Sequence, residues 1–262
     1  MSRAVVNGEM NEWMTNVKNI SRARARYQRF TTMSDRRDGN DEKDLDRAAR
    51  ILSVAKSVLV ITGAGLSADS GMPTYRGITG LYNRDTEDGI PIELALSGET
   101  FRRDPALCWK YIRELELACR DAEPNEGHAV LAEWEKRFER FLVLTQNIDS
   151  FHRRAGNEHV IEIHGDVNSL HCTVCDWKET NARTDQDDVP WDMPTCKSCG
   201  AVARPPVVLF GEQLRSNDVA QYVREIDKKC YDVVMSVGTT SVFPYIASPF
   251  LKQAGRAGPS AF

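Results

Sequence analysis

The chain contains four short, continuously apolar runs, and segments with apolar residues at helical spacing lie before or between them. The runs are VLVIT (58–62), FLVLT (141–145), VVLF (207–210) and DVVMSVGTT (232–240). Apolar runs without alternation are typical of strands that are covered on both faces. Helical spacing is found over 45–57, 128–141 and 219–230. We therefore predict an α/β fold with a parallel sheet and helices on both of its faces.

Two segments do not fit this pattern. Residues 167–203 contain few apolar residues and hold two cysteine pairs, so we predict a small inserted module there. Residues 1–44 show no long apolar periodicity, and we interpret them as a flexible N-terminal extension. Its basic part is more typical of a solvated arm than of a site for an acidic partner. The main α/β domain would then comprise 45–166 and 204–262.

The cysteine spacing indicates a metal site. Four of the seven cysteines form two Cys-x-x-Cys pairs, Cys172 with Cys175 and Cys196 with Cys199. Two such pairs can place four thiolates around one ion, which is the closed tetrahedral shell of structural zinc. A redox Cys-x-x-Cys would be a single motif near the start of a βαβ unit. We therefore predict a zinc ion that stabilises a module too small to have a core.

Composition narrows the classes of function. The chain has 262 residues, 41% of them hydrophobic, and a net charge of −4 with a pI of about 5.8. This balance does not favour a nucleic-acid partner. No apolar run approaches the roughly 20 residues of a membrane span, and the first residues lack the apolar core of a secretory signal. We expect a cytoplasmic protein without a membrane or nucleic-acid partner.

Polar motifs follow three of the predicted strands. GAGLSADSGMPTYRG (63–77) follows the first, TQNIDSFHRRAG (145–156) the second, and GTT ends the last. Ligands of parallel sheets bind beyond the carboxyl ends of the strands, so these motifs predict a ligand site. Gly63 and Gly65 would let the backbone approach a phosphate. Without the third glycine of G-x-G-x-x-G, however, they do not decide between a nucleotide site and a simple turn.

Two further motifs have alternative interpretations. Most lone histidines serve packing, but His164 lies directly before the inserted module, where a pocket between two units would form. A neutral imidazole there could act as a general base. The segment 204–212, RPPVVLFGE, is either a strand of the sheet or an extended backbone that pairs with a peptide. Its residues leave both possibilities open.

Together, these motifs resemble the sirtuin family of NAD-dependent protein deacylases, in its bacterial type with structural zinc. The resemblance covers 45–262 and rests on GAGLSADSGMPTYRG, TQNIDSFHRRAG, IHG at 163–165, both cysteine pairs, VLFGE and VGTT, in the family's order. It implies a Rossmann-like domain that binds NAD as co-substrate, a small zinc-binding domain, and an active cleft between them.

The resemblance also implies a role for each motif residue. The catalytic residues would be His164, as general base for a ribose hydroxyl, and Asn147. The NAD-binding residues would be Gly63, Ala64, Gly65, Ser67, Tyr75, Arg76, Gln146, Asn147, Ile148, Asp149, Gly238, Thr239 and Thr240. The residues that bind the substrate backbone would be Val208, Phe210, Gly211 and Glu212. The zinc ligands would be Cys172, Cys175, Cys196 and Cys199.

The implied reaction removes an acyl group from lysine of acyl-lysine proteins or peptides. The acyl oxygen attacks the ribose of NAD and nicotinamide leaves. The hydroxyl activated by His164 then attacks, which yields deacylated lysine, nicotinamide and O-acyl-ADP-ribose. Tyr75 and Arg76 would form a mobile cover that shields the reacting sugar from water.

The chain departs from the family pattern in three places. Tyr75 replaces the usual phenylalanine and Thr74 a common aspartate, and both changes are tolerable. Family members that prefer succinyl- or malonyl-lysine carry Tyr-x-x-Arg on one helix, where this chain has Ile112 and Leu115. We therefore expect a preference for acetyl or other neutral acyl groups. Finally, the chain ends at AGRAGPSAF, before the family's last strand and asparagine loop, and we interpret this end as a truncation.

Two other functions compete with deacylation. On the same fold, the enzyme could be an NAD glycohydrolase or an ADP-ribosyltransferase, for which nicotinamide release would not need acyl-lysine. His164 beside a complete VLFGE segment favours the deacylase. A non-enzymatic zinc module would present a basic, aromatic surface over 167–203, but that segment has an acidic excess.

Overall fold

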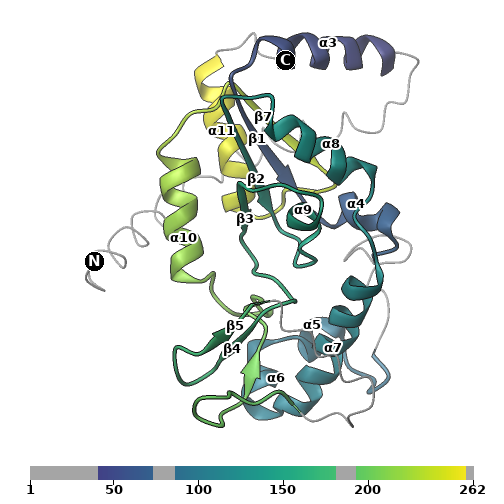
Figure 1. Ribbon diagram of the computed structural model, residues 1–262, viewed down its shortest axis with the longest axis vertical. Coiled ribbons are helices and arrows are strands. Elements are labelled where there is room, and N and C mark those ends of the chain that lie inside the picture. The colour runs from purple at the N-terminus through teal and green to yellow at the C-terminus, as the bar shows by residue number, and fades with distance from the viewer. Residues whose placement is uncertain (1–40, 73–85, 181–192, 258–262) are drawn as a thin grey trace.

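The computed structural model describes residues 41–72, 86–180 and 193–257. Its main sheet has four parallel strands in the order β3–β2–β1–β7 (Figure 1). Their bounds are β1 (Ser57–Thr62), β2 (Arg140–Thr145), β3 (Val160–Glu162) and β7 (Val233–Val237). The strands pair in parallel throughout, with Ser57 opposite Arg140 and Val58 opposite Val233. The predicted α/β fold with a parallel sheet is confirmed.

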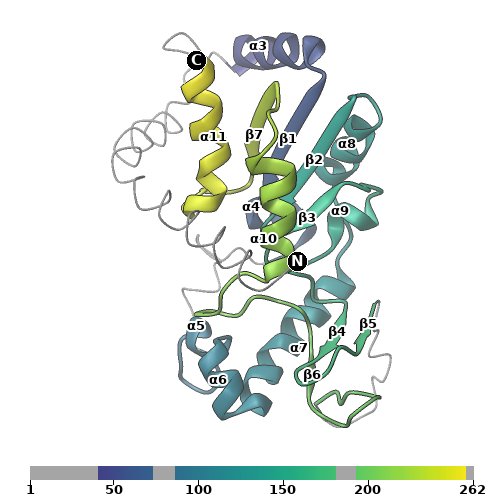
Figure 2. The same ribbon diagram turned by 90° about the vertical axis from the view of Figure 1, so that its left-hand side faces the viewer.

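Helices cover both faces of this sheet (Figures 1 and 2). On one side lie α10 (Ser216–Tyr222), the π-helical turn η3 (Val223–Asp227) and α11 (Pro244–Ala257). On the other lie α8 (Glu126–Glu135) and α9 (Phe151–Arg154), while α3 (Asp41–Val54) lies across the end of the sheet where β1 begins. Along β1, Leu59 and Ile61 face the first group, whereas Val58 and Val60 face the second. All four are fully buried, which explains why the strand sequence does not alternate.

A second unit lies at one end of the molecule and contains a small antiparallel sheet in the order β5–β4–β6 (Figure 1). Its elements are β4 (Leu170–Cys172), β5 (Lys178–Glu179), β6 (Ala203–Arg204), α5 (Ile92–Ala95), α6 (Gly98–Arg103) and α7 (Pro105–Asp121). Trp109 and Ile112 of α7 share one apolar cluster with Leu170 of β4. We therefore propose that α5–α7 belong with the cysteine-containing module rather than with the predicted domain over 45–166.

Of the two alternatives for 204–212, the strand of the main sheet is excluded, because the run VVLF at 207–210 is not part of that sheet. Val208 donates its N–H to the carbonyl of His164, and Phe210 donates to that of Leu96. The segment is thus an extended connection between the two units. The segment is apolar because Leu209 is buried in the apolar cluster of the second unit. In the sequence, an apolar run buried in this way cannot be told from a strand that is covered on both faces.

The predicted N-terminal extension over 1–44 lies outside the described residues except for 41–44, which form the start of α3. The helix predicted over 45–57 is α3 itself, which begins four residues earlier and ends at Val54. Within the described part of the chain, no helix combines the length and apolarity that crossing a membrane requires.

Two histidines are buried beneath the carboxyl ends of the main strands. His152 of α9 shares a hydrogen bond of 2.9 Å with the Thr62 hydroxyl, and its ring lies edge-on to that of His128 at 5.0 Å. Burial, together with the nearby His128, lowers the pKa of His152 to about 4, and burial also lowers the pKa of His128. Both rings are therefore neutral in the folded protein at pH 7.

This burial predicts a loss of stability in mild acid. An unfolded His152 titrates near its ordinary pKa of about 6.5, so the unfolded state binds the proton first as the pH falls. The free energy of unfolding should fall by about 3 kcal/mol between pH 6.5 and pH 4 through this residue. Urea unfolding at several pH values would measure the fall. His152→Gln, which cannot titrate, should flatten it, whereas His159→Gln at an exposed histidine should not.

Candidate active site

The loops that follow β1 and β7 interlock at three glycines. Gly65 donates its N–H to the carbonyl of Gly238 at 2.8 Å, and Gly63 donates to that of Val237 at 3.2 Å. A Cβ on Gly65 would lie 2.8 Å from Gly238 Cα, and Gly238 has a φ of +65°. Side chains at these positions would push the two loops apart. The glycines thus hold two strand ends together at the edge where ligands of parallel sheets bind.

The described part of the motif that follows β1 contains only short helical elements. The structure has α4 (Ala64–Ser67), followed by the 3₁₀ turn η1 (Ala68–Ser70). Gly71, with a φ of +85°, ends this turn. The motif GAGLSADSG is therefore a compact loop rather than the start of a long helix.

A buried network of hydrogen bonds explains why the motif TQNID contains so many polar residues. The amide nitrogen of Asn147 donates to the Gly63 carbonyl at 3.1 Å and to the Ser67 hydroxyl at 3.0 Å. The Ser67 hydroxyl donates to Asp149 at 2.7 Å, and the Phe151 N–H donates to the same carboxylate at 2.9 Å. All three polar side chains are less than 10% exposed. Because each buried polar group is bonded, the network fixes the loop after β2 against the loop after β1.

His164 lies in the turn after β3, with both ring nitrogens bonded. Its Nδ1 is 2.9 Å from the Gln146 carbonyl oxygen, and its Nε2 is 2.6 Å from the Tyr245 hydroxyl. A carbonyl oxygen can only accept, so Nδ1 carries the proton and Nε2 carries the lone pair. Burial lowers the pKa of His164, whereas the bond to Gln146 opposes this shift. The ring is therefore neutral at pH 7 and can accept a proton at Nε2.

Gln146 connects the strand ends on the other side of the site. Its side-chain nitrogen donates to the Thr239 hydroxyl at 2.7 Å and to the Thr62 carbonyl at 3.3 Å. The same residue accepts the His164 proton with its backbone carbonyl. The loops after β1, β2 and β7 and the turn after β3 are thus joined by hydrogen bonds around one space.

That space is a cavity of about 740 Å³ between the two units. Most predicted site residues line it: Gly63, Ala64, Gly65, Gln146, Asn147, Ile148, His164, Val208, Phe210, Gly211, Glu212, Gly238, Thr239 and Thr240. Ser67 and Asp149 do not line it: the Ser67 hydroxyl accepts from Asn147 and donates to Asp149. Tyr75 and Arg76 lie outside the described residues. The structure therefore brings the motifs together, although they come from five separate parts of the chain.

Several residues of the cavity wall were not identified from the sequence as site residues. They are Leu96, Val167, Val207, Leu209, Leu214, Val242, Phe243 and Tyr245, while Ile112 and Leu115 were noted only for acyl preference. Most are apolar and cannot be told from core residues by pattern. Phe243 and Tyr245 lie three and five residues after the predicted GTT motif, and two aromatic residues so close to a strand-end motif were the available signal.

The segment after Pro206 forms one wall of the cavity and is held in an extended form. Glu212 accepts hydrogen bonds from the Leu209 N–H at 3.0 Å and from Arg204 at 2.8 Å. Gly211, with a φ of +79°, forms the turn that allows the carboxylate to bond back. Glu212 therefore stabilises the segment as well as lining the cavity.

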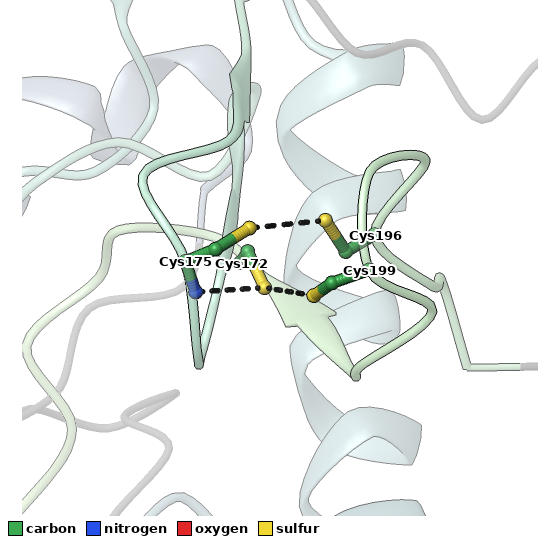
Figure 3. A group of neighbouring side chains, drawn as sticks. All are labelled: Cys172, Cys175, Cys196 and Cys199. Atoms are coloured by element: carbon green, nitrogen blue, oxygen red, sulfur yellow. Dashed lines mark hydrogen bonds between the residues drawn. The ribbon is translucent and has the colours of Figure 1, made fainter.

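The four predicted metal ligands come together in the second unit (Figure 3). Their sulfur atoms all lie within 4.8 Å of one another, with Cys172 3.4 Å from Cys199 and Cys175 3.6 Å from Cys196. Backbone N–H groups of Val174 and Cys175 point to Cys172 Sγ, as in tight metal-binding knuckles. Four thiol sulfurs at this spacing fit a tetrahedral zinc ion and leave no coordination position open.

Comparisons with known proteins show which family the chain belongs to. The family model described as the Sir2 family matches residues 63–244. An NAD-dependent protein deacylase 2 of Pseudomonas aeruginosa is 53% identical over 216 residues, which cover 81% of this chain and 83% of that protein. A solved Sir2 homologue in complex with NAD has a TM-score of 0.69 and 30% identity, over 81% of this chain and 79% of that chain.

A third relative is a Sir2 variant solved with a deacetylated p53 peptide and 3′-O-acetyl ADP-ribose. It has a TM-score of 0.68 and 27% identity, over 82% of this chain and 83% of that chain. The extent of these matches shows the family. The chain belongs to the Sir2, or sirtuin, family, as its motifs predicted.

The cysteine cluster predicts a measurable dependence of stability on zinc. Cys196→Ser removes one buried ligand, so bound zinc should fall from about one ion per chain toward zero. The free energy of metal binding contributes to folding, and the melting temperature should fall with it. Metal analysis and calorimetry would test both changes. Cys230→Ser, at an exposed cysteine outside the cluster, should retain zinc and stability; a zinc content unaffected by Cys196→Ser would contradict the assignment.

Proposed function

We propose that the cavity between the two units removes acyl groups from protein lysines with NAD as co-substrate. The observation that supports this proposal is that the hydrogen-bonded Asn147 amide and the neutral His164 ring both line one cavity of about 740 Å³. The chain is an NAD-dependent protein deacylase, which agrees with its relatives. The same deacylase reaction follows from the sequence resemblance.

The cavity offers the groups that a dinucleotide needs. Its volume lies within the range of sites for small molecules and cofactors. The glycine loops bring backbone close to its surface, and Thr239 adds a hydroxyl. NAD, when bound, supplies the ribose carbon that the acyl oxygen attacks, and nicotinamide is the leaving group. We assign the glycines to the phosphates and Asn147 to the nicotinamide end, where Asp149 supports Asn147 through Ser67.

The role of this chain at the reacting centre is to hold groups in place and accept a proton. Asn147 is fixed by its two hydrogen bonds, so little reorganisation is needed to position a ligand beside it. His164 presents its lone pair from a neutral ring and stabilises positive charge through the Nδ1 bond to Gln146. It is the general base for a ribose hydroxyl. The zinc site has a closed shell and supports the second unit without a part in the chemistry.

The apolar wall of the cavity suits a neutral acyl group. Ile112 and Leu115 line it from α7, at the positions where acid-selective family members would carry Tyr-x-x-Arg. Glu212 is the only acidic side chain on the described part of the wall. A negatively charged acyl group would therefore lose its hydration without gaining a cation from these two positions. We assign acetyl and other neutral acyl-lysine peptides as preferred substrates.

The first prediction of this proposal is that nicotinamide release depends on an acyl-lysine peptide. The chain should release nicotinamide from NAD with an acetyl-lysine peptide and form one deacetylated lysine per nicotinamide. His164→Ala should reduce deacetylation by about 10²-fold or more, since it removes the general base. Chromatography of nicotinamide and mass spectrometry of the peptide would measure both. Release that is equally fast without peptide would instead indicate a glycohydrolase.

A second prediction concerns the acyl group. On one peptide sequence, acetyl should be removed at least about tenfold faster than succinyl, which corresponds to about 1.4 kcal/mol of transition-state free energy. The double variant Ile112→Tyr/Leu115→Arg should shift this ratio toward succinyl, because it adds a hydroxyl and a cation to the cavity wall. Val130→Arg, on the exposed side of α8, is the control and should leave the ratio unchanged. Equal rates for both acyl groups in the unmodified chain would contradict the assignment.

A further inference from the structure

The Tyr245 hydroxyl forms a hydrogen bond with His164 Nε2, the atom that would accept a proton if His164 acts as a general base. The hydroxyl oxygen is 2.6 Å from His164 Nε2, and both residues line the cavity. Because Nδ1 carries the histidine proton, Nε2 is the acceptor and the phenol is the donor. A ribose hydroxyl that enters the cavity therefore meets a lone pair that is already bonded to Tyr245.

The phenol is held firmly at this position. The Phe243 ring stacks on the Tyr245 ring, with centroids 5.5 Å apart and planes within 16°. The Tyr222 hydroxyl donates to the Tyr245 carbonyl at 2.7 Å and bonds Ser248, which fixes the first turn of α11. Tyr245 also packs against the apolar cluster on this face of the sheet. A ring stacked on one side and fixed at its backbone favours a stationary group over one that swings out of the way.

We infer that Tyr245 is a proton relay, through which the ribose hydroxyl passes its proton to His164. This inference rests on the proposed deacylase function. The hydroxyl gives its proton to the phenol oxygen, while the phenol proton moves to Nε2. The hydroxyl oxygen keeps its electron pair for the bond to the acyl carbon. The net change is one proton transferred from the hydroxyl to His164, and the phenol ends as it began.

The groups around His164 suit this transfer. The Gln146 carbonyl faces it from the loop after β2. Tyr245 faces it from α11, and the Phe243 ring lies nearly perpendicular to it in the turn before α11. Glu212 lines the same cavity from the segment after Pro206. Burial raises the pKa of Tyr245, so the phenol keeps its proton at neutral pH and can donate it. The Gln146 carbonyl accepts from Nδ1 throughout and stabilises the cation that forms.

The test is Tyr245→Phe, which keeps the stacked ring and removes only the hydroxyl. Exchange of labelled nicotinamide into NAD precedes the proton step, and it should continue with an acetyl-lysine peptide. Net deacetylation should fall by about 10²-fold, the scale of a lost acid–base group. The hydrogen bond to Nε2 favours the neutral ring, so its removal should also raise the pKa of His164. The acid limb of kcat/KM should move to higher pH, which a merely structural role would not produce.

Tyr231→Phe is the matched control. It removes another buried phenol hydroxyl from the same face of the sheet, one that donates to the Glu225 carbonyl and does not line the cavity. It should leave both exchange and deacetylation unchanged. A further check is a double variant: in a His164→Ala chain, Tyr245→Phe should add little, because both changes interrupt one proton path.

Each alternative outcome overturns the relay. Faster deacetylation by Tyr245→Phe would show that the phenol only obstructs His164, and an unchanged rate would show that it does not take part. Equal loss of exchange and deacetylation would show a role in binding or folding. If the unmodified chain neither exchanges nor releases nicotinamide with peptide, the proposed function itself is wrong, and the relay with it. An active unmodified chain with an unaffected variant would reject the relay alone.

Discussion

The side-chain amide of Asn147 ties the loop after β2 to the loop after β1, and the remainder of the site is arranged around this contact. Its two donated hydrogen bonds end on a backbone carbonyl and on Ser67, and Ser67 passes the connection on to Asp149. In a buried site these bonds are strong, and an unpaired member would be costly. This requirement explains why a core strand is followed at once by so many polar residues. They satisfy one another in the folded protein and leave one surface open to the cavity.

The cavity depends on a second constraint, because its walls belong to two units. The extended segment at 207–210 bonds to the His164 carbonyl on one side and to the backbone around Leu96 on the other. It therefore connects the turn after β3 with α5 and α6. The turn that presents His164 to the cavity is consequently fixed by the same backbone that forms one wall of the cavity. A displacement of the second unit would disturb both features together, which links the integrity of the cysteine cluster to the geometry of the site.

The sequence predicted the α/β class and the cysteine cluster from local features, whereas most of the cavity-wall residues were named through the resemblance to a family. Continuous apolar runs, paired knuckles and strand-end motifs retain their meaning without knowledge of contacts. The interpretation of apolar runs as strands failed where a residue is buried outside the main sheet. Leu209 is buried against α7 rather than in a sheet, so VVLF looked like a strand. Tyr245 was missed because its importance comes from a single contact with His164, eighty-one residues away in sequence.

The contact between His164 and Tyr245 also shows what burial does to a proton in this site. Removal from water lowers the pKa of the imidazole and raises the pKa of the phenol, so both groups are neutral and share one hydrogen bond. A charge on either group would cost desolvation free energy before a ligand binds. The backbone carbonyl of Gln146 then matters, since it is a fixed dipole already aligned with Nδ1 and favours the imidazolium without reorganisation. The structure therefore keeps the His164 ring neutral and places a carbonyl dipole where it would stabilise a positive charge on that ring.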